Sequence, residues 1–463
     1  MKHAPRAAGT WFPLCLAGGI LANCAFAQQS GTAGDRYVVF GIPLESPNHA
    51  SPPPPGDGRT AEIDPASAAS PFGWHDTDGA PGAESTRTNG NNVHAGTDTN
   101  ADNVLDPGSD PDCTASLDCD FPLDLTLTPA TYRPAAVTNL FYWTNLVHDV
   151  AFAYGFDPAA GNFQTNVYGG GGLGADPVQA EAQDGSGSNG ANFTTPPDGL
   201  SPRLQMFVWS PATPDRDGAL DNGIVVHELG HGISNRLVGG PANTSCLGNR
   251  QQPGEGLSDW WALLFTQPND TAAAARLRGL GTYLFDQPVD GLGIRTDYYD
   301  GDPELNPEPR ENSWTYASIS TAAIPHGVGS RWAQAYWQVT WALIDAHGYD
   351  PDLGHFTGGV ADAGNLRAMW FIVEGLKNTL CSPTFTDVRD GVLAAAVAAY
   401  GGEDVCLVWR AFAEFGLGSE AVSGGPSSTT PIDGFAVPAA CSPPLFADGF
   451  ETGATGRWSL TLP

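Results

Sequence analysis

The chain has 463 residues, with 51 acidic residues against 20 Lys and Arg, and its formal net charge is -31. This length can bury one large core or two to three modest domains. The negative charge repels phosphate backbones and anionic bilayers, so neither a nucleic acid nor a membrane surface is an expected partner. The composition therefore indicates a globular protein and excludes nucleic-acid binding as its expected function.

The first 27 residues have the pattern of a secretory signal peptide. Lys2 and Arg6 precede an apolar run from Trp11 to Ala22, and Ala25–Ala27 is a small-x-small cleavage pattern. The run is shorter than the about 20 residues that span a bilayer. A lipoprotein site is the weaker alternative, because Asn23 fits poorly before its cysteine. We expect a secreted, extracellular chain with no membrane anchor after cleavage.

Cysteine usage agrees with export. Six cysteines follow the signal peptide, and they allow 15 pairings; they are Cys113, Cys119, Cys246, Cys381, Cys406 and Cys441. Only Cys113 and Cys119 are close enough in sequence to suggest a local disulfide. No pair has the C-x-x-C spacing of a structural zinc site, so cysteines are not expected to bind metal.

Two kinds of sequence alternate along the chain. Residues 28–125 and 160–215 are rich in Gly, Pro, Ser, Asp and Asn, with short apolar runs such as Tyr37–Phe40, which is typical of loops and short strands. Between them, apolar positions three and four residues apart predict a helix from near Pro134 to Gly155. Helical patterns then dominate, and we expect helices near 222–237, 255–266, 327–346, 363–378, 386–400 and 404–415.

This order predicts an α+β protein with a β-containing front half and a mainly helical back half. We expect four parts: a signal peptide (1–27), an N-terminal lobe (28–238) that ends in the helix 222–237, a helical C-terminal lobe (239–424), and a linker with a C-terminal tail (425–463). The last boundary follows a change to a Gly/Ser/Pro/Thr-rich stretch after Gly424.

The strongest chemical signal is the H-E-x-x-H match at 227–231, inside the predicted helix 222–237. His227 and His231 project from one helical face, so both imidazoles can reach one ion at about 2.0–2.1 Å. Glu228 lies beside the first histidine, where it can act as general base toward an attacking water. Chance produces such a match in about one chain in a hundred of this length. The alternative to a metal site is therefore an ordinary polar helix face exposed to solvent. A further metal ligand elsewhere in the sequence is needed to exclude it.

Glu255 is the candidate for that further ligand. Catalytic zinc takes three protein ligands and leaves one position open for water, and Glu255 begins the next predicted helix, after a Gly- and Pro-rich hairpin that can turn the two helices antiparallel. Asp259 lies one turn further on the same face, where it can accept the free N–H of His227 and define its tautomer. These residues predict one zinc ion held by His227, His231 and Glu255.

With these residues in view, the chain resembles the fungalysin family of metallopeptidases, which are relatives of thermolysin. The resemblance covers roughly residues 35 to 420. It rests on H-E-L-G-H-G-I-S-N-R-L-V-G-G-P (227–241), G-E-G-L-S-D (254–259), N-L-F-Y-W-T-N-L-V-H-D (139–149), A-Q-D-G-S-G-S-N-G-A-N-F-T-T-P-P-D-G (182–199) and C-S-P-T-F (381–385). It implies a two-lobed thermolysin-like fold, a zinc-dependent endopeptidase activity and broad protein or peptide substrates.

The same likeness implies roles for five more residues. His326 resembles the family histidine that steadies the tetrahedral intermediate, a task for an imidazole donor. Arg295 is similar to the arginine that holds a substrate carbonyl, and Tyr299 is a candidate for the same cleft. Asn189 and Ala191 lie in a segment that resembles the edge strand along which these enzymes bind the substrate backbone.

Some residues depart from the family pattern. Gly190 stands where an asparagine is usual, Leu257 replaces a usual tryptophan, and Ser330 replaces a usual glutamate. The family's large propeptide is expected to be absent, because family-like sequence begins soon after the signal peptide. These departures leave two alternatives to a general endopeptidase: a peptidase of narrow specificity that processes partners or trims termini, and an inactive, zinc-stabilised binding protein.

Five residues with side-chain oxygens, spaced two or four positions apart, suggest a calcium loop: Asp98, Asn100, Asp102, Asp106 and Asp110. The twelfth position counted from Asp98 is Ser109 rather than the glutamate that closes an EF-hand. A solvated acidic loop is the favoured interpretation, and calcium binding stays a second hypothesis. The expected oligomeric state is a monomer.

Overall fold

The structure is a computed structural model that describes residues 35–64, 67–301 and 314–442. The predicted signal peptide and the end of the predicted tail (443–463) lie outside the described residues. Within the described ranges, no helix has both the length and the apolar character that crossing a membrane requires. Helices and sheets are both present, which confirms the predicted α+β class.

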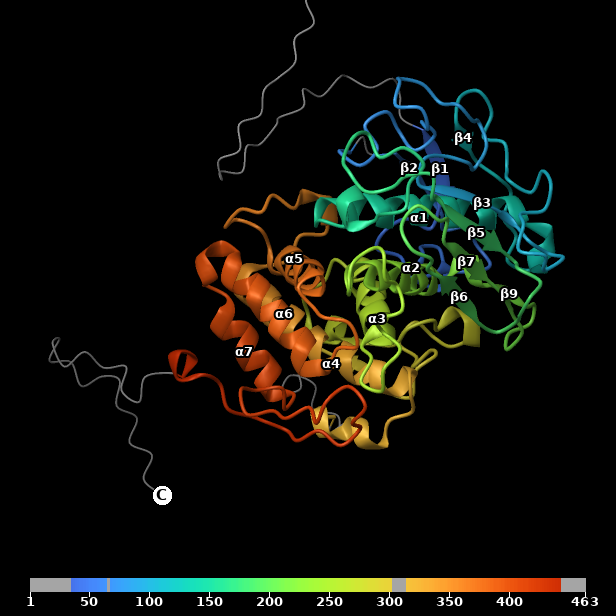
Figure 1. The fold of residues 1–463 in the computed structure, drawn as a ribbon. Helices are drawn as coiled ribbons and strands as arrows, with labels where there is room; N and C mark the ends of the chain where they lie inside the picture. Colours follow the sequence, from blue (N-terminus) through green and yellow to red (C-terminus); the bar gives the residue numbers. More distant parts are fainter. Residues whose placement is uncertain (1–34, 65–66, 302–313, 443–463) are drawn as a thin grey trace, which may run out of the picture. The chain divides into compact units, whose positions relative to one another are not determined.

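The largest sheet has four strands in the order β3-β5-β7-β6 (Figure 1). β3 (Val93–Thr97), β5 (Val178–Ala182) and β7 (Arg203–Met206) run parallel, while β6 (Ala191–Thr194) runs antiparallel to β7 and forms one edge. Most residues of β3 and β5 are buried whichever way they point, as is usual for parallel strands covered on both faces. The smaller sheets consist of β2 (Thr60–Ile63), β1 (Arg36–Val39) and β4 (Asp118–Cys119); β8 (Val208–Trp209) and β9 (Arg216–Asp217); and β10 (Leu277–Arg278) and β11 (Tyr299–Asp300).

Helix α1 (Arg133–Ala153) packs against β1, β3 and β5. Pro134 stands in its first turn, where a backbone N–H has no helical partner to lose. Residues 135–151 are all buried, which is typical of a helix enclosed on every side. Trp143 Nε1 donates a hydrogen bond to the Phe40 carbonyl at 2.8 Å and thereby ties the end of β1 to the helix.

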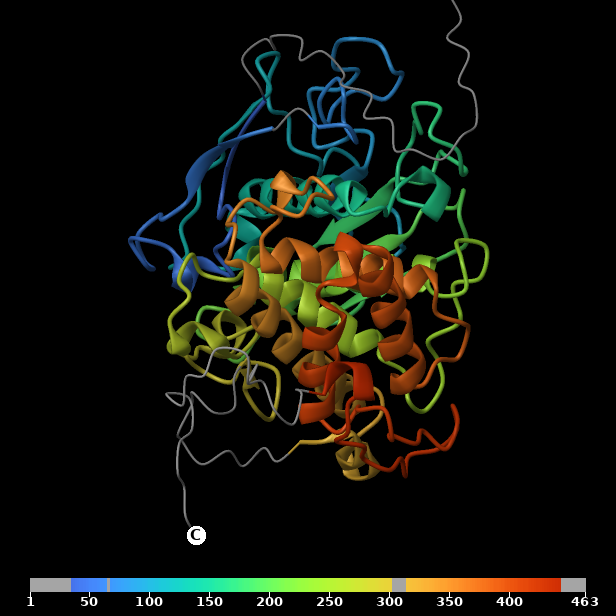
Figure 2. The ribbon, with the colours of Figure 1, turned by 90° about the vertical axis from the view of Figure 1, so that its left-hand side faces the viewer.

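Six longer helices follow: α2 (Asn222–Leu237), α3 (Gly254–Phe265), α4 (His326–His347), α5 (Gly364–Lys377), α6 (Phe385–Ala398) and α7 (Val405–Glu414). All six predicted helices are present, with ends close to the predicted positions. α2 contacts α3, α3 contacts α4, and α4 contacts α5 and α7. Figure 2 shows the orange to red helices of this half gathered on one face, with the green helices behind them.

Short 3₁₀ helices lie in the connections between these elements; in the described residues they are Pro47–His49, Pro129–Thr131, Pro158–Ala160, Gly218–Leu220, Ala273–Arg276, Tyr283–Phe285, Tyr316–Thr321, Leu353–His355, Tyr400–Gly402 and Ala439–Cys441.

Glycines let α2, α3 and α4 approach one another closely. A Cβ on Gly230 of α2 would lie 2.8 Å from Ser258 Cα of α3, and a Cβ on Gly256 of α3 would lie 2.1 Å from the Gly329 carbonyl oxygen of α4. Any side chain at these positions would clash with backbone, so the observed spacing requires glycine. The backbone of α3 is therefore in direct contact with α2 on one side and with α4 on another.

Three disulfides join the six cysteines of the described chain. Cys113–Cys119 confirms the predicted local pair. Cys246–Cys381 and Cys406–Cys441 link residues far apart in sequence. The second of these ties the segment after α7 back to α7, where Arg410 also donates to the Cys441 carbonyl at 3.1 Å.

Candidate active site

Helix α2 presents the two motif histidines on one face. Its first turn is capped by Asp221, whose Oδ1 accepts a hydrogen bond from the Ile224 N–H at 3.2 Å. The rings of His227 and His231 lie one turn apart, with centroids 4.8 Å from each other. The helix thus orients two imidazoles toward a common point, as the spacing predicts.

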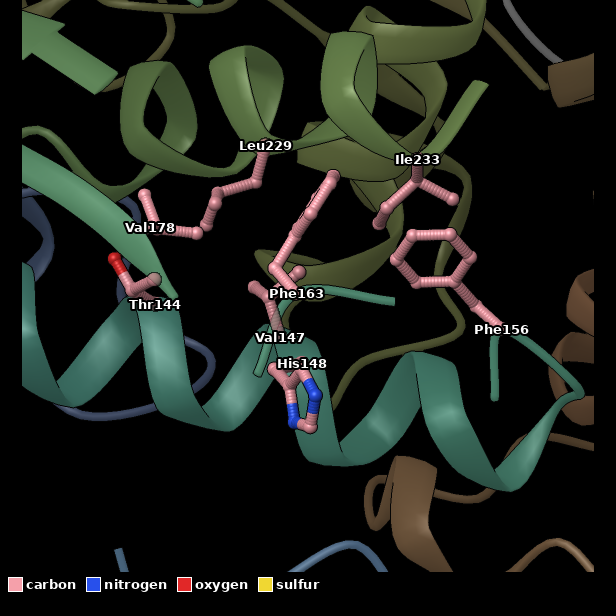
Figure 3. A pocket seen from close by; sticks show the side chains of 8 residues that line it. All are labelled: Thr144, Val147, His148, Phe156, Phe163, Val178, Leu229 and Ile233. Atoms are coloured by element: carbon pink, nitrogen blue, oxygen red, sulfur yellow. The ribbon is translucent and has the colours of Figure 1, made fainter. Parts of the chain in front are cut away.

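The opposite face of α2 is packed into the core. Leu229 and Ile233 project from α2 toward Phe163 and toward α1, as Figure 3 shows. The cavity between them measures about 10 Å³; its lining residues are Thr144, Val147, His148, Phe156, Phe163, Val178, Leu229 and Ile233. Because this face is almost completely filled by apolar side chains, α2 has little freedom to rotate or shift.

Glu255 of α3 brings a carboxylate to the two histidines. One ligand atom each from His227, His231 and Glu255 lies within 4.8 Å of the others. His227 Nε2 is 3.4 Å from Glu255 Oε2, and His231 Nε2 is 3.8 Å from Glu255 Oε1. Donors bound at about 2.0–2.1 Å around one tetrahedral ion are about 3.3–3.4 Å apart. Glu255 Oε2 is buried without a hydrogen-bond partner among the described residues, so these three side chains could hold a metal ion.

Asp259, one turn after Glu255, lies behind the first histidine. Its Oδ1 is 2.8 Å from His227 Nδ1. Arg295 donates to both of its oxygens, from Nε and from Nη2, each at 2.7 Å. The Tyr299 hydroxyl also donates to Asp259. Burial would raise the pKa of Asp259, but Arg295 and His227 hold it well below its usual range, so the carboxylate stays ionised.

The charges around the site favour a cation between the acidic groups. Burial would lower the pKa of His227, but Asp259 and Glu255 outweigh it and raise that pKa to about 10. Burial, together with the charge of His227, lowers the pKa of His231 to about 4. The proton on His227 therefore lies between two carboxylates, Asp259 and Glu255. A divalent cation bound there would replace that proton on His227.

Glu228 is buried beside this cluster. Burial raises its pKa to about 7, although His227 opposes the shift. A carboxyl group in this range can take up and release a proton near neutral pH, which a general base has to do.

His326 is the first residue of α4 and stands at the open side of the site. Its side chain is 64 % exposed, and its Nε2 lies 3.5 Å from Glu255 Oε1. The Ser330 hydroxyl donates to the His326 carbonyl at 3.1 Å, one turn along the helix. His326 is therefore the residue of the cluster that a ligand from solvent meets first.

The predicted edge strand is present as β6, which contacts α2. Gly232 of α2 faces the ring of Phe193, since a Cβ there would lie 2.5 Å from that ring. Ala191 is the first residue of β6. Asn189 lies just before the strand, and its side chain is engaged with Ser210, whose N–H donates to Asn189 Oδ1 at 2.7 Å.

Arg295 and Tyr299 lie on the inner side of the site. Arg295 Nη2 comes within 3.7 Å of Glu255 Oε2, while Nε and Nη2 of the same arginine donate to Asp259. Tyr299 is fully buried, so the structure places its hydroxyl against Asp259 rather than at a cleft open to solvent. The close-contact glycines Gly230, Gly256 and Gly329 are not predicted by the motifs; a glycine inside a helical pattern is the signal that points to them.

Comparison with known proteins identifies the family of the chain. The profile of the family described as Fungalysin metallopeptidase (M36) matches residues 36–421. "Extracellular metalloproteinase 3" of Arthroderma otae is 38% identical over 392 residues, which cover 83% of this chain and 58% of that protein. "Extracellular metalloproteinase MEP" of Leptosphaeria maculans is 37% identical over 386 residues, which cover 80% of this chain and 56% of that protein. The chain thus spans a little over half the length of these relatives. Since the profile covers most of the chain, the protein belongs to the fungalysin metallopeptidases (M36).

Proposed function

We propose that the chain is a secreted zinc-dependent endopeptidase that hydrolyses peptide bonds in proteins. The observation that carries this proposal is the convergence of His227, His231 and Glu255, with the carboxyl of Glu228 beside them. Family membership supports it, as do the names of the relatives, which are called extracellular metalloproteinases.

In this proposal His227, His231 and Glu255 hold one zinc ion. Two imidazoles, one carboxylate and a fourth position left to solvent are a usual donor set of catalytic zinc. The bound ion would supply Lewis acidity, which makes a water molecule a good nucleophile at neutral pH.

The protein's own groups then move the protons. Glu228 accepts a proton from the attacking water and passes it to the leaving amine. His326, exposed at the mouth of the site, donates a hydrogen bond to the oxygen on which negative charge develops. The substrate backbone adds to the edge strand β6, which begins at Ala191 and follows Asn189, and a peptide bond would then lie over α2.

Asp259 and Tyr299 act as positioning residues. Asp259 orients the ring of His227 through Nδ1, and Tyr299 holds Asp259 from the buried side. Arg295 neutralises Asp259, and Arg295 is the candidate for holding a substrate carbonyl because its Nη2 lies 3.7 Å from Glu255 Oε2.

The organisation of the chain is part of the same proposal. A signal peptide at 1–27 would direct secretion, the lobe at 28–238 would provide the substrate strand and two metal ligands, and the lobe at 239–424 would provide Glu255 and His326. The residues 425–463 would follow as linker and tail. We propose that the chain acts as a monomer, which sedimentation equilibrium would check.

The test measures zinc content and casein hydrolysis on the same purified chain. We expect about one zinc per chain, loss of hydrolysis when a chelator removes it, and recovery when zinc is returned in stoichiometric amount. Sequencing of the products separates a general endopeptidase from a narrow one. A chain that holds zinc but cleaves neither casein nor a peptide library contradicts the proposed activity.

A further inference from the structure

A second cluster of acidic side chains lies at the ends of two parallel strands, away from the histidines. Asp98 follows β3 directly, Glu181 is in β5, and Asp184 comes shortly after β5. β3 and β5 are paired in register, with Gly96 opposite Glu181, so the three residues meet at the carboxyl ends of both strands. Their exposed fractions are 0 %, 1 % and 2 %, and one carboxylate oxygen of each lies within 4.8 Å of the other two.

The hydrogen bonds of this cluster leave it short of positive partners. Asp98 accepts from the backbone of Asp102 and Asn103, at 3.2 and 2.7 Å. Asp184 accepts from the Ser186 N–H and from Gln205 Nε2, each at 2.6 Å. These donors are neutral, so they leave the negative charge in place.

Glu181 is the residue whose hydrogen bonding is incomplete. Arg203 Nε lies 3.4 Å from its Oε1, but its Oε2 is buried without a hydrogen-bond donor among the described residues. Three buried carboxyl groups face one arginine, so the cluster has fewer positive than acidic groups. Burying unpaired charge is costly, so a positive partner is expected there.

Another acidic cluster shows how the same need is met by a side chain. Asp404 and Glu403 lie beside His347. Arg367 Nη1 donates to Asp404 at 2.7 Å and to Glu403 at 2.6 Å. That cluster has its own buried cation. Among the described residues, the cation recorded beside Glu181 is Arg203, at the longer distance of 3.4 Å.

We propose that Asp98, Glu181 and Asp184 bind one calcium ion, separate from the metal site of the histidines. A ligand set made only of oxygens suits a hard cation such as calcium, which takes 6–8 oxygens. Glu181 Oε2, which has no donor among the described residues, would be the first ligand, and the oxygens of Asp98 and Asp184 that already accept hydrogen bonds would offer their remaining lone pairs. Zinc is not favoured, because it prefers nitrogen and sulfur donors.

The site differs from the calcium loop that the sequence suggests. Only Asp98 of that loop belongs to the buried cluster. Asp106 Oδ2 is occupied by Thr97 and Thr99, and Asp110 pairs with Arg87 at 3.1 Å. The other two proposed ligands lie in β5 and just after it, far along the chain from Asp98, so the spacing within the loop could not predict this site.

A bound ion would join the loop that follows β3, which begins at Asp98, to the segment that leads from β5 into β6. Asp184 begins that segment, and the Gly185 N–H already donates to the Asp98 carbonyl at 2.8 Å. The competing explanation is a proton shared between Glu181 and Asp184, since burial and the neighbouring Asp184 raise the pKa of Glu181 to about 8. A cation and a shared proton make opposite predictions about added calcium.

The experiment uses the full zinc-loaded chain with Glu228→Gln, so that self-cleavage does not contribute. Equilibrium dialysis with radioactive calcium and thermal unfolding in calcium-free buffer, with and without CaCl₂, are the two measurements. We expect one calcium per chain, and a rise in Tm of about 3–5 °C at a calcium concentration about a hundred times the Kd. Glu181→Gln and Asp184→Asn should each abolish both effects.

Asp102→Asn is the matched control, because Asp102 is exposed in the same loop and lies outside the buried cluster. It should keep the binding and the shift in Tm. A parent chain that binds no calcium overturns the proposal, whether or not the variants fold. Binding that survives Glu181→Gln, or that disappears with Asp102→Asn alone, overturns it as well. Neither result affects the proposed peptidase, whose zinc and activity are measured separately.

Discussion

The contact between Gly256 and Gly329 offers a quantitative test of how the site is assembled. A Cβ on Gly256 would lie 2.1 Å from the Gly329 carbonyl oxygen and 2.9 Å from the Ala333 nitrogen. Both obstacles are backbone atoms, so no side chain can move aside. Gly256→Ala therefore has to push α3 and α4 apart by about 1 Å before a normal contact distance is reached.

Two effects follow from that displacement. Overpacking of a core costs about 1–3 kcal/mol, and a clash with backbone belongs at the upper end, so Tm should fall by about 6 °C. The same movement separates Glu255 from His326; Oε1 of Glu255 and Nε2 of His326 are 3.5 Å apart in the structure. A misplacement of about 1 Å can lower the rate about a hundredfold, so kcat/KM should fall by about ten- to a hundredfold.

Gly254→Ala is the matched control on the same helix. A Cβ there would lie 3.7 Å from Leu247 Cδ1, which is an ordinary contact. Both variants change glycine to alanine in α3, so the difference between them isolates the clash. Circular dichroism gives Tm, competition with a chelator gives zinc affinity, and a fluorogenic peptide gives kcat/KM. If the Gly256 variant is as stable and as active as the Gly254 variant, the backbone contact does not organise the site.

Three further predictions concern single side chains. Glu228→Gln should lower kcat by at least about 10²–10⁴-fold with zinc content unchanged, and substantial remaining activity would rule out Glu228 as the base. Asp259→Asn should weaken zinc binding about 10–100-fold, measured by competition with a chelator, because the carboxylate that holds His227 Nδ1 is lost; unchanged affinity would assign Asp259 a structural role only. Leu229→Ala should enlarge the cavity behind α2 and lower the free energy of unfolding in urea by about 2–5 kcal/mol while one zinc per chain is retained, and a smaller effect would mean that this face repacks.

Features that depend on near neighbours could be predicted from the sequence. The helix of His227 and His231, its start near residue 222 and the position of Glu255 on the next helix all follow from apolar periodicity and capping residues within one or two turns. Two histidines four residues apart must share a face, so their convergence needed no tertiary information. The family likewise follows from motifs that are continuous in sequence.

Features that join distant segments could not be predicted in this way. The spacing of Tyr299 from Asp259 gives no sign that the tyrosine is buried against that carboxylate, and the reach of Arg295 to both Asp259 and Glu255 is equally non-local. The pairing of Cys246 with Cys381 and of Cys406 with Cys441 was open among the possible combinations. Such contacts depend on how whole elements pack.

The sequence by itself therefore determined the helices, the α+β class, the family and the histidine pair, because each depends on side chains within a few residues or on continuous motifs. The tertiary structure alone decided that backbone contact at Gly256 brings α3 against α4, and that Asp98 meets Glu181 and Asp184. The physical reason is that strand register and helix packing, rather than local propensity, bring such residues together.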